Sequence, residues 1–382
     1  MIDTLLEAPP KNWQAYTPVL RAKASEWKAL EMLRPNIRRR IVPIVEFVPD
    51  WKQPGSSTTT KRRAAQTPTE YVRRTVESAL KATPPDTRAF VYFGLVGSTA
   101  QWRGIDLWSE FESRVPAQAG LIPLADLTSV DATPSLMKAV RSCSEVGLRI
   151  DTRDIGPGLG ARIDRALEVI GKPRESAYIV VDLKDAPAAV PQALVRAAFG
   201  IAHKFAGVVV LAGVFPMDLT HYPMGVSAEP RTEWHIWWRE HVATPTNERM
   251  LAYGDYTTQC AHYRPSPDVP GSVSLRYTTD DAILVFRGRQ SNSGAGFGHE
   301  QMHGHCRLLV ARGDYDGASF SWGDQRVHCW TMPSNGTGNA LQWRTASIVH
   351  HITHVVIQLQ DPVGSSATAR SWARGQVPAT CS

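Results

Sequence analysis

The 382-residue sequence lacks the motifs that identify the commonest nucleotide-binding and hydrolytic enzymes. No GxGxxG follows its first apolar run and no GxxxxGK[ST] occurs, which argues against the usual dinucleotide and P-loop sites. Neither a GxSxG elbow nor the set of protein-kinase motifs is present, so serine hydrolysis and kinase chemistry are not expected. The Gly-rich segment 156–160 lacks a phosphate-binding lysine, and we interpret it as a turn.

Cysteine is scarce, and long apolar runs are absent. The five cysteines are scattered without CxxC spacing, which argues against a disulfide framework and fits a reducing compartment. No apolar run approaches the roughly 20 residues of a membrane span, and the N-terminus lacks the basic-then-apolar order of a signal peptide. With 43% hydrophobic and 20% charged residues, the sequence predicts a folded, cytoplasmic protein without a membrane segment.

The excess of positive charge is confined to the N-terminal fifth. Residues 1–80 hold 14 Lys and Arg against 8 Asp and Glu, whereas the rest of the chain holds 28 of each. The short basic runs Arg38–Arg40 and Lys61–Arg63 contribute to this excess and could meet phosphate or an acidic partner. Contact with nucleic acid is therefore one hypothesis for this stretch. Because the runs lack interleaved aromatic residues, we favour a solvated loop and helix end.

Eight apolar β-type runs alternate with helical patterns. They are Ile41–Phe47, Phe90–Val96, Leu121–Leu127, Leu148–Ile150, Ile179–Val181, Gly207–Phe215, Met250–Tyr256 and Ala282–Arg289. Near-continuous apolar runs are typical of buried parallel strands, and runs two to six recur about every 30 residues, the length of one strand–helix unit. The pattern predicts a single-domain (β/α)8 TIM-type barrel, with an open doubly wound sheet as the alternative. Residues 13–40 are expected to form a helical lead-in and residues 41–289 the barrel strands.

The last third of the chain departs from this repeat. Residues 257–281 show little clear helix, and residues 291–344 form a longer elaboration after the eighth strand, rich in Gly, Ser, His and Trp. We expect both to lie over one face of the barrel. Residues 345–360 have helical spacing and are expected to form the last barrel helix, and residues 361–382 a tail.

Two histidine-containing segments are candidates for metal binding. The segment 299–306 contains His299, His303, His305 and Cys306, which are zinc-ligand types, but the spacing matches no established signature. We therefore expect a loop there and no zinc.

The second segment is HHITH, in which His350, His351 and His354 are expected on the polar side of the last helix. A third segment, EWHIWW (233–238), contains tryptophans at helical spacing, which we expect to pack rather than to bind a ligand.

Charged residues gather at the carboxyl ends of the predicted strands, the face on which barrel enzymes build their sites. The expected catalytic or metal-binding groups are Asp151, Asp154, Asp182 and Asp255, and the expected substrate-binding groups are Glu46, Asp126, Arg153, Lys184, Tyr256 and Arg287. Clustered carboxylates suit acid–base chemistry or a hard cation such as Mg²⁺, and the interleaved cations suit a phosphate or carboxylate substrate. The alternative is that these charges pair with one another as a structural network.

Several segments together resemble one known family. The N-terminal pattern Tyr16-x-Pro18-x-Leu20-x-x-Lys23-x-x-Glu26-x-x-Ala29-Leu30, followed by IVPIVEF, resembles the N-terminus of the beta family proteins, named after the Beta product of a satellite-phage gene cluster. The later LRIDTRDI, VVDLKD, GDY and HHITH segments are similar in placement. The resemblance implies a role in phage–host conflict, as a component of a phage-defence or toxin–antitoxin module. It implies no catalytic residues.

Two functions of different classes follow. In the first, the protein is a binding or sensing component whose barrel face recognises a phage product or a protein partner from the same gene cluster. In the second, it is a metal-dependent enzyme that acts on a phosphorylated or nucleotide-like substrate at the same face. A filled, salt-bridged barrel mouth with an exposed apolar patch would favour the binding component, whereas carboxylates with split pKa values around a deep pocket would favour the enzyme. The fold alone does not decide between them.

Overall fold

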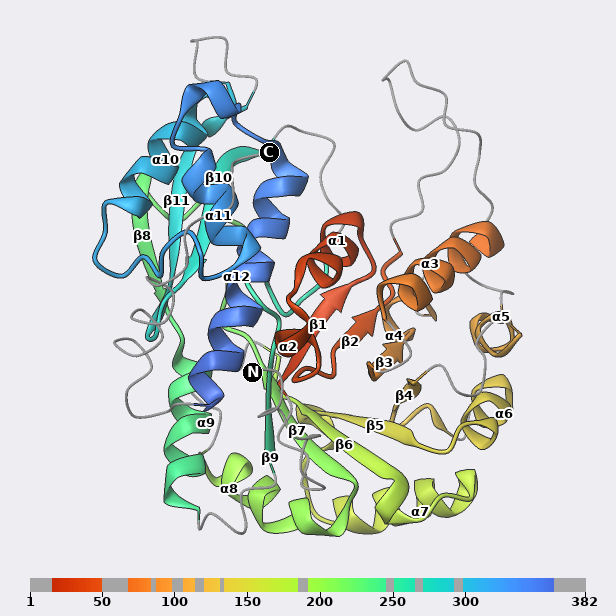
Figure 1. Cartoon of the computed structure of the whole chain (residues 1–382). Helices are drawn as coiled ribbons and strands as arrows, with labels where there is room; N and C mark the ends of the chain where they lie inside the picture. The colour runs from red at the N-terminus through yellow and green to blue at the C-terminus, as the bar shows by residue number, and fades with distance from the viewer. Residues whose placement is uncertain are drawn as a thin grey trace, which may run out of the picture.

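The structure is a computed structural model, which describes residues 16–49, 68–83, 87–97, 106–113, 120–130, 134–184, 192–244, 251–264, 271–291 and 298–360. Its largest element is a closed barrel of eight parallel strands surrounded by helices (Figure 1). The strands are β1 (Thr17–Arg21), β2 (Ile44–Glu46), β3 (Ala89–Tyr92), β4 (Leu121–Asp126), β5 (Val146–Asp151), β6 (Ala177–Asp182), β7 (Gly207–Ala212) and β9 (Leu251–Asp255). The predicted (β/α)8 architecture is confirmed.

One of the eight strands was assigned wrongly from the sequence. The residues 17–21, expected within a helical lead-in, form β1, which closes the barrel by pairing with β2 on one side and β9 on the other. The closing register places Thr17 opposite Gly254 and Pro18 opposite Asp255. The seven apolar runs from Ile41–Phe47 to Met250–Tyr256 supply the other seven strands.

The helices of the barrel follow the strands in the expected alternation. They are α1 (Ala24–Met32), α2 (Pro35–Arg38), α3 (Pro68–Ala82), α4 (Gly94–Gly97), α5 (Leu107–Glu112), α6 (Pro134–Ser142), α7 (Leu159–Ile170), α8 (Gln192–Ile201) and α9 (Thr232–Ala243). Helix α7 shows why these segments are helical: Ile163, Ala166, Leu167 and Ile170 recur at helical spacing and are all buried. Its C-cap is Gly171 in the left-handed conformation, which a residue without a side chain adopts readily.

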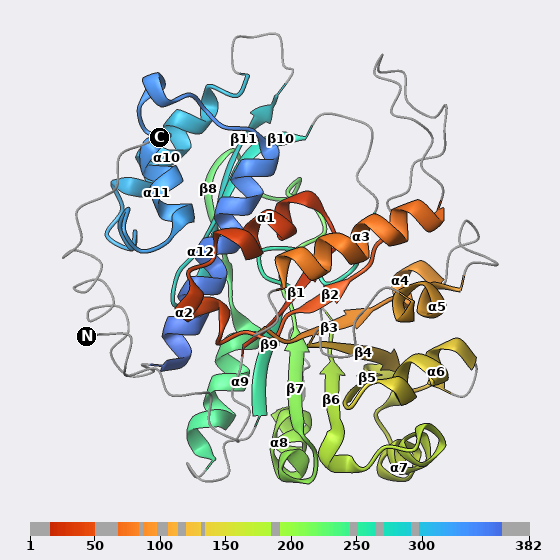
Figure 2. The ribbon, with the colours of Figure 1, turned by 45° about the vertical axis from the view of Figure 1, so that its right-hand side comes forward.

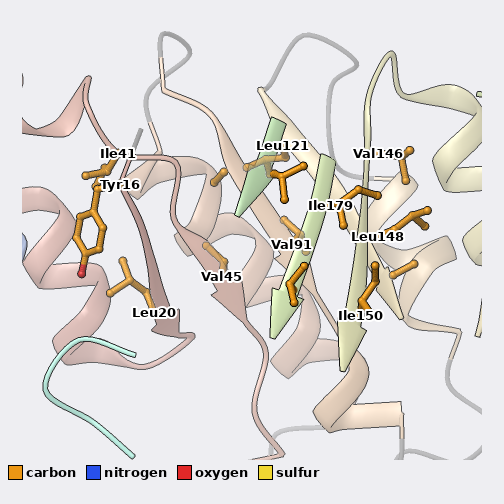
Figure 3. Close-up of a cluster of buried hydrophobic side chains, with 14 of the residues drawn as sticks. Tyr16, Leu20, Ile41, Val45, Val91, Leu121, Val146, Leu148, Ile150 and Ile179 are labelled. Atoms are coloured by element: carbon orange, nitrogen blue, oxygen red, sulfur yellow. The ribbon is translucent and has the colours of Figure 1, made fainter. Parts of the chain in front are cut away.

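Two apolar layers hold the barrel together. One lies between the strands and the surrounding helices, and Figure 3 shows part of it, with Leu148 and Ile150 of β5 near Ile179 of β6. The other fills the barrel interior, where Phe90, Leu124 and Val180 meet. Strand β5 alternates between the layers, since its even-numbered residues face the helices. Gly147 faces the interior so closely that a Cβ there would lie 2.7 Å from a methyl group of Leu124.

A second, smaller sheet stands beside the barrel. It has three antiparallel strands in the order β10 (Ser272–Thr278), β11 (Ala282–Gln290) and β8 (Gly225–Pro230). The run Ala282–Arg289, expected as the eighth barrel strand, is therefore the central strand of this separate sheet. Its β-branched and aromatic residues suit a strand in either place, so local composition could not tell the two sheets apart.

Helices α10 (Gln301–Val310), α11 (Trp322–Cys329) and α12 (Ala340–Gln360) complete the structure around this sheet. Residues 299–306, expected as a loop, enter helix α10, so that interpretation is wrong over residues 301–306. Met302, Cys306 and Leu309 of α10 are fully buried against the small sheet. The elaboration expected after the eighth strand is thus a packed layer with its own apolar core.

Helix α12 lies between the two parts of the molecule (Figures 1 and 2). Ile348, Ile352 and Val355 belong to the core of the barrel wall, whereas Trp343 and Ala346 belong to the core of the small sheet. Because both sides of this helix are covered, its three histidines are buried, and the expectation that they lie on a polar surface is wrong.

Two further expectations can be compared with the structure. Trp234 and Trp237 are almost completely buried and pack against Tyr253, which confirms a packing role for the EWHIWW segment. Cys143, Cys260 and Cys306 are free thiols, whereas Cys329 is disulfide-bonded. No helix among the described residues combines the length and the apolar character needed to cross a membrane.

Candidate functional site at the barrel mouth

A buried charge network closes the floor of the barrel mouth, the end at which the parallel strands terminate. Its centre is Arg149 of β5, whose Nε donates to Oδ2 of Asp182 on β6 at 2.8 Å. Its Nη1 donates to Glu46 of β2 at 3.4 Å, and its guanidinium lies 4.1 Å from the centre of the Tyr92 ring. Arg21 of β1 reaches the other carboxylate oxygen of Glu46 at 3.4 Å. Every member of this network is less than a tenth exposed.

Asp182 is held by partners on three sides. Besides its contact with Arg149, it accepts a hydrogen bond from the Tyr256 hydroxyl at 2.8 Å and forms an ion pair with Lys184 Nζ at 3.0 Å. Burial alone would raise the pKa of Asp182, but Arg149 and Lys184 outweigh it and hold this pKa below its usual value. The carboxylate is therefore ionised and fully paired, which leaves it no lone pair for a metal or a substrate proton.

Asp126 of β4 is in a different state. Its carboxylate accepts hydrogen bonds from the Tyr92 hydroxyl at 2.9 and 3.0 Å. Burial raises the pKa of Asp126 even though the positive charge of Arg149 acts in the opposite direction. Among the carboxylates of the mouth, Asp126 thus has a raised pKa and Asp182 a lowered one, which is the pattern expected of a group that exchanges protons beside one that stays charged.

Above this floor is a cavity of about 500 Å³. It is lined by Tyr92, Gly94, Asp126, Thr128, Arg149, Asp151, Arg153, Asp154, Asp182 and Lys184. Its volume falls within the range of small-molecule sites, but its lining is far more polar than is usual for them. The loop after β9 packs against the network beneath the cavity, because Ala261 joins the interior cluster and the backbone carbonyl of Cys260 accepts a hydrogen bond from Arg21 at 2.7 Å.

The rim of the cavity is formed by the turn after β5, where Thr152–Asp154 is a short 3-10 helix. Asp151 accepts from the backbone N–H of Arg153 at 2.6 Å and from its Nε at 2.9 Å. Asp154 accepts from the backbone N–H of Asp151 at 3.0 Å, which closes a capping box. Arg162 also reaches Asp154. These two carboxylates therefore shape the turn, while the Arg153 side chain itself is 89% exposed.

Eight of the ten predicted site residues lie at the mouth, and two do not. Arg287 lies on β11 of the small sheet, where its Nη1 donates to the carbonyl groups of Thr220 and Tyr222. Asp255 faces the outside of the barrel wall. It accepts from the Tyr16 hydroxyl at 2.5 Å and lies 3.0 Å from Nε2 of His351 on α12. We correct both placements. Arg287 was placed at the mouth because its strand was taken for the eighth barrel strand, and Asp255 because its side chain was expected to point into the barrel.

The sequence interpretation missed Arg149, Arg21 and Tyr92. Arg149 carried a signal, because it is a charge within the apolar run Leu148–Ile150, and a buried Arg needs paired partners. Arg21 was missed because its strand was taken for helix. Tyr92 was missed because an aromatic residue in a buried strand reads as core.

The basic N-terminal stretch is only partly described. Arg38 donates to the carbonyl groups of Glu31 and Leu33 at 3.1 Å and so helps to end α1, while Arg40 is exposed. Residues 61–63 lie outside the described residues. Contact with nucleic acid through this stretch remains a prediction.

The comparisons with known proteins identify a family. Curated proteins yield no match to this chain. The family model described as Beta protein matches residues 16–357, from the residue before β1 into the last turn of helix α12. Because this match covers most of the chain, the protein belongs to the Beta protein family.

Proposed function

We propose that this protein is the recognition component of a phage-defence or toxin–antitoxin module, and that the barrel mouth binds a phage product or a partner from the same gene cluster. The observation that carries the proposal is the state of the charges beneath the cavity. Asp182 and Glu46 are paired with Arg149 and Arg21 in a buried network. A site above such a paired network is suited to bind a ligand of complementary shape and charge rather than to supply several reactive carboxylates.

The cavity specifies the kind of group that it would bind. The Lys184 side chain is 27% exposed and the Arg153 side chain 89% exposed, so both can reach an anionic group at the mouth. Asp126 offers carboxylate oxygens to hydroxyl or amine donors on the same ligand. We therefore propose a small polar ligand, or a protruding polar group of a larger partner, that carries one anionic group and at least one hydrogen-bond donor.

The test is a phage-challenge plating assay with the complete gene cluster. Thr128 lines the cavity and is exposed, so Thr128→Trp would fill the cavity without touching the buried network. Glu175→Trp places the same bulk on an exposed site away from the mouth. We expect protection to fall for Thr128→Trp and to persist for Glu175→Trp, with both variants folded by circular dichroism. Full protection by Thr128→Trp would contradict recognition through the mouth.

A second function is favoured by one observation, the raised pKa of Asp126 beside an open cavity. In that case the protein is an enzyme in which Asp126 transfers a proton and Lys184 holds an anionic substrate such as a phosphorylated or nucleotide-like compound. Mg²⁺ at the mouth is less well supported, since Asp151, Asp154 and Asp182 already have hydrogen-bonded partners.

The two functions differ in the outcome of one substitution. We would screen inorganic phosphate, nucleoside monophosphates and amino acids by thermal shift, and follow any binder by mass spectrometry. Enzymatic function requires that the binder is converted by the wild type and that Asp126→Asn still binds but no longer converts it. A binding component leaves the ligand unchanged in both.

A further inference from the structure

Helix α12 presents two buried imidazoles on one face, away from the barrel mouth. His350 and His354 are four residues apart, so their side chains lie one helical turn from each other. Their ring centroids are 5.7 Å apart. His350 is 1% exposed and His354 8% exposed. A buried pair of histidines at this spacing is a common half of a metal site, provided that a third ligand comes from elsewhere.

The third group comes from the segment between α10 and α11. Asp316 is also 8% exposed, and its Oδ2 lies 3.1 Å from Nδ1 of His354. One ligand atom from each of Asp316, His350 and His354 lies within 4.8 Å of the others. The backbone N–H of Asp316 donates to the Tyr277 hydroxyl at 2.8 Å, which fixes the position of the residue.

The outer nitrogens of the two imidazoles each lie near an oxygen atom. Nε2 of His350 lies 2.8 Å from the carbonyl oxygen of Thr278, and a carbonyl can only accept, so this nitrogen carries the proton. Nε2 of His354 lies 3.2 Å from Oδ1 of Asp280. In each ring Nδ1 faces a carboxylate, Asp324 for His350 and Asp316 for His354, and a cation that binds at Nδ1 replaces the proton held between them. A carboxylate or carbonyl behind the far nitrogen is the usual way in which proteins orient a metal-binding histidine.

We propose that Asp316, His350 and His354 form a binding site for a divalent transition metal ion, with Zn²⁺ as the best match to two imidazoles and one carboxylate. Asp324 lies beside the site, since its Oδ2 is 3.0 Å from Nδ1 of His350. Metal–ligand bonds of about 2.0–2.1 Å place tetrahedral ligand atoms roughly 3.3 Å apart. The three ligand atoms, which lie within 4.8 Å of one another, would therefore move closer together by up to about 1.5 Å around the ion.

The surroundings suit such a site. The His350 ring stacks on Tyr277 with 3.7 Å between centroids, and Phe320 lies against both imidazoles. Asp324 is held by Tyr277 and by Ser321, which donate to its two oxygens at 2.9 and 2.5 Å. Asp280 is 38% exposed, so the site lies one side chain from solvent and an ion has a way in. The site also joins the small sheet to α12, which links metal binding to the packing of the two parts.

The experiment uses the full chain after dialysis against a chelator. Zn²⁺ is titrated in competition with a chromophoric chelator, and Co²⁺ is added separately because tetrahedral Co²⁺ has strong visible absorption. We expect one equivalent of each metal to bind, and a loss of affinity of at least tenfold in His354→Gln and in Asp316→Asn. The matched control is His351→Gln, which removes a buried imidazole from the same helix but faces Asp255 and Tyr16. It should keep the site.

Two results would overturn the proposal. One is the failure of the wild-type chain to bind one equivalent of Zn²⁺ or Co²⁺, which needs no variant to fold. The other is unchanged binding by folded His354→Gln and Asp316→Asn, which would assign the metal to other ligands. In either case the cluster would be a set of hydrogen-bonded ion pairs between α12 and the small sheet.

Discussion

Arg149 and Asp182 face each other from adjacent strands, with the Arg149 Nε 2.8 Å from Oδ2 of Asp182 and neither side chain more than 3% exposed. Removing one partner of such a pair leaves the other charge buried without compensation. The pair lies at the floor of the proposed ligand site. Together with Glu46 and Arg21 it forms a network in which buried charges from β1, β2, β5 and β6 compensate one another. We infer that these charges support the site and that the groups above them contact the ligand.

We expect Asp182→Asn to lower the free energy of unfolding by about 3–5 kcal/mol, because it removes the nearer of the two carboxylates that compensate the buried Arg149 guanidinium. Chemical denaturation followed by circular dichroism measures this. Asp151→Asn is the control, since it disrupts the Asp151–Arg153 pair, in which Arg153 is 89% exposed, and should cost no more than about 1 kcal/mol. Equal effects of the two substitutions would show that the buried network does not stabilise the barrel.

A second prediction concerns the closure of the barrel by β1. The Tyr16 hydroxyl donates to Asp255 at 2.5 Å and ties the start of β1 to the end of β9. Tyr16→Phe leaves Asp255 buried with one hydrogen bond fewer, at an expected cost of about 1–3 kcal/mol. Tyr71→Phe removes a half-buried hydroxyl that donates to a carbonyl at 2.8 Å, and should cost less. A larger loss in Tyr71→Phe would contradict this role for Tyr16.

The closing strand also shows where the sequence reaches its limit. Thr17 pairs with Gly254, and no local pattern specifies a contact over such a separation. The five residues of β1 include a proline and a single Leu–Val pair, whereas Leu20, Trp27 and Leu30 together gave a helical spacing. The stronger β pattern of Ala282–Arg289 was therefore assigned as the eighth barrel strand. The number of strands was predictable from alternation, but the identity of the strand that closes the barrel was not.

The side of a strand was equally hard to predict. Asp255 and Tyr256 end the same strand, but Asp255 points to α12 and Tyr256 into the barrel. In a parallel barrel both faces of a strand are buried, so apolar residues occur on both and the alternation that would mark the inner face is lost. The position of a residue along the barrel axis was predictable from the ends of the strands, which is why Asp126, Asp182 and Lys184 were expected at the mouth, where the structure has them.

A third prediction tests the contact between α11 and α12. A Cβ built on Gly323 would lie 2.2 Å from the backbone oxygen of Ala346, so the two helices approach closely only because this residue has no side chain. Gly323→Ala should destabilise the protein by about 1–3 kcal/mol.

Gly304 is the matched control for this substitution. It lies within α10, is exposed, and a Cβ there would meet nothing within 4 Å. Gly304→Ala should therefore stabilise the protein by about 0.5–1 kcal/mol through helix propensity. Thermal unfolding of both variants shows whether each substitution stabilises or destabilises the protein. A stabilised Gly323→Ala would show that α11 can move away from α12 without cost.

The last prediction follows from Glu233, a carboxyl at the start of α9 that is 8% exposed and has no hydrogen-bond partner for its Oε2 among the described residues. Burial raises its pKa to about 8, although the nearby Arg231 acts to lower it. The unfolded chain has a pKa near 4.3 at this position. Between these two values the folded state holds a proton that the unfolded state has lost, so the contribution of Glu233 to stability is complete at low pH and disappears as the pH rises to about 8.

Glu233→Gln keeps the size of the side chain and removes the titration. The difference in unfolding free energy between wild type and Glu233→Gln should therefore change by up to about 1.4 kcal/mol per pH unit across this window, with the variant relatively more stable at pH 8 than at pH 5. Denaturation at several pH values measures it. Glu175→Gln, at an exposed site, should follow the wild type at a constant offset. If Glu233→Gln runs parallel to the wild type as well, the Glu233 carboxyl is ionised in the folded protein, and Arg231 compensates its charge despite the burial.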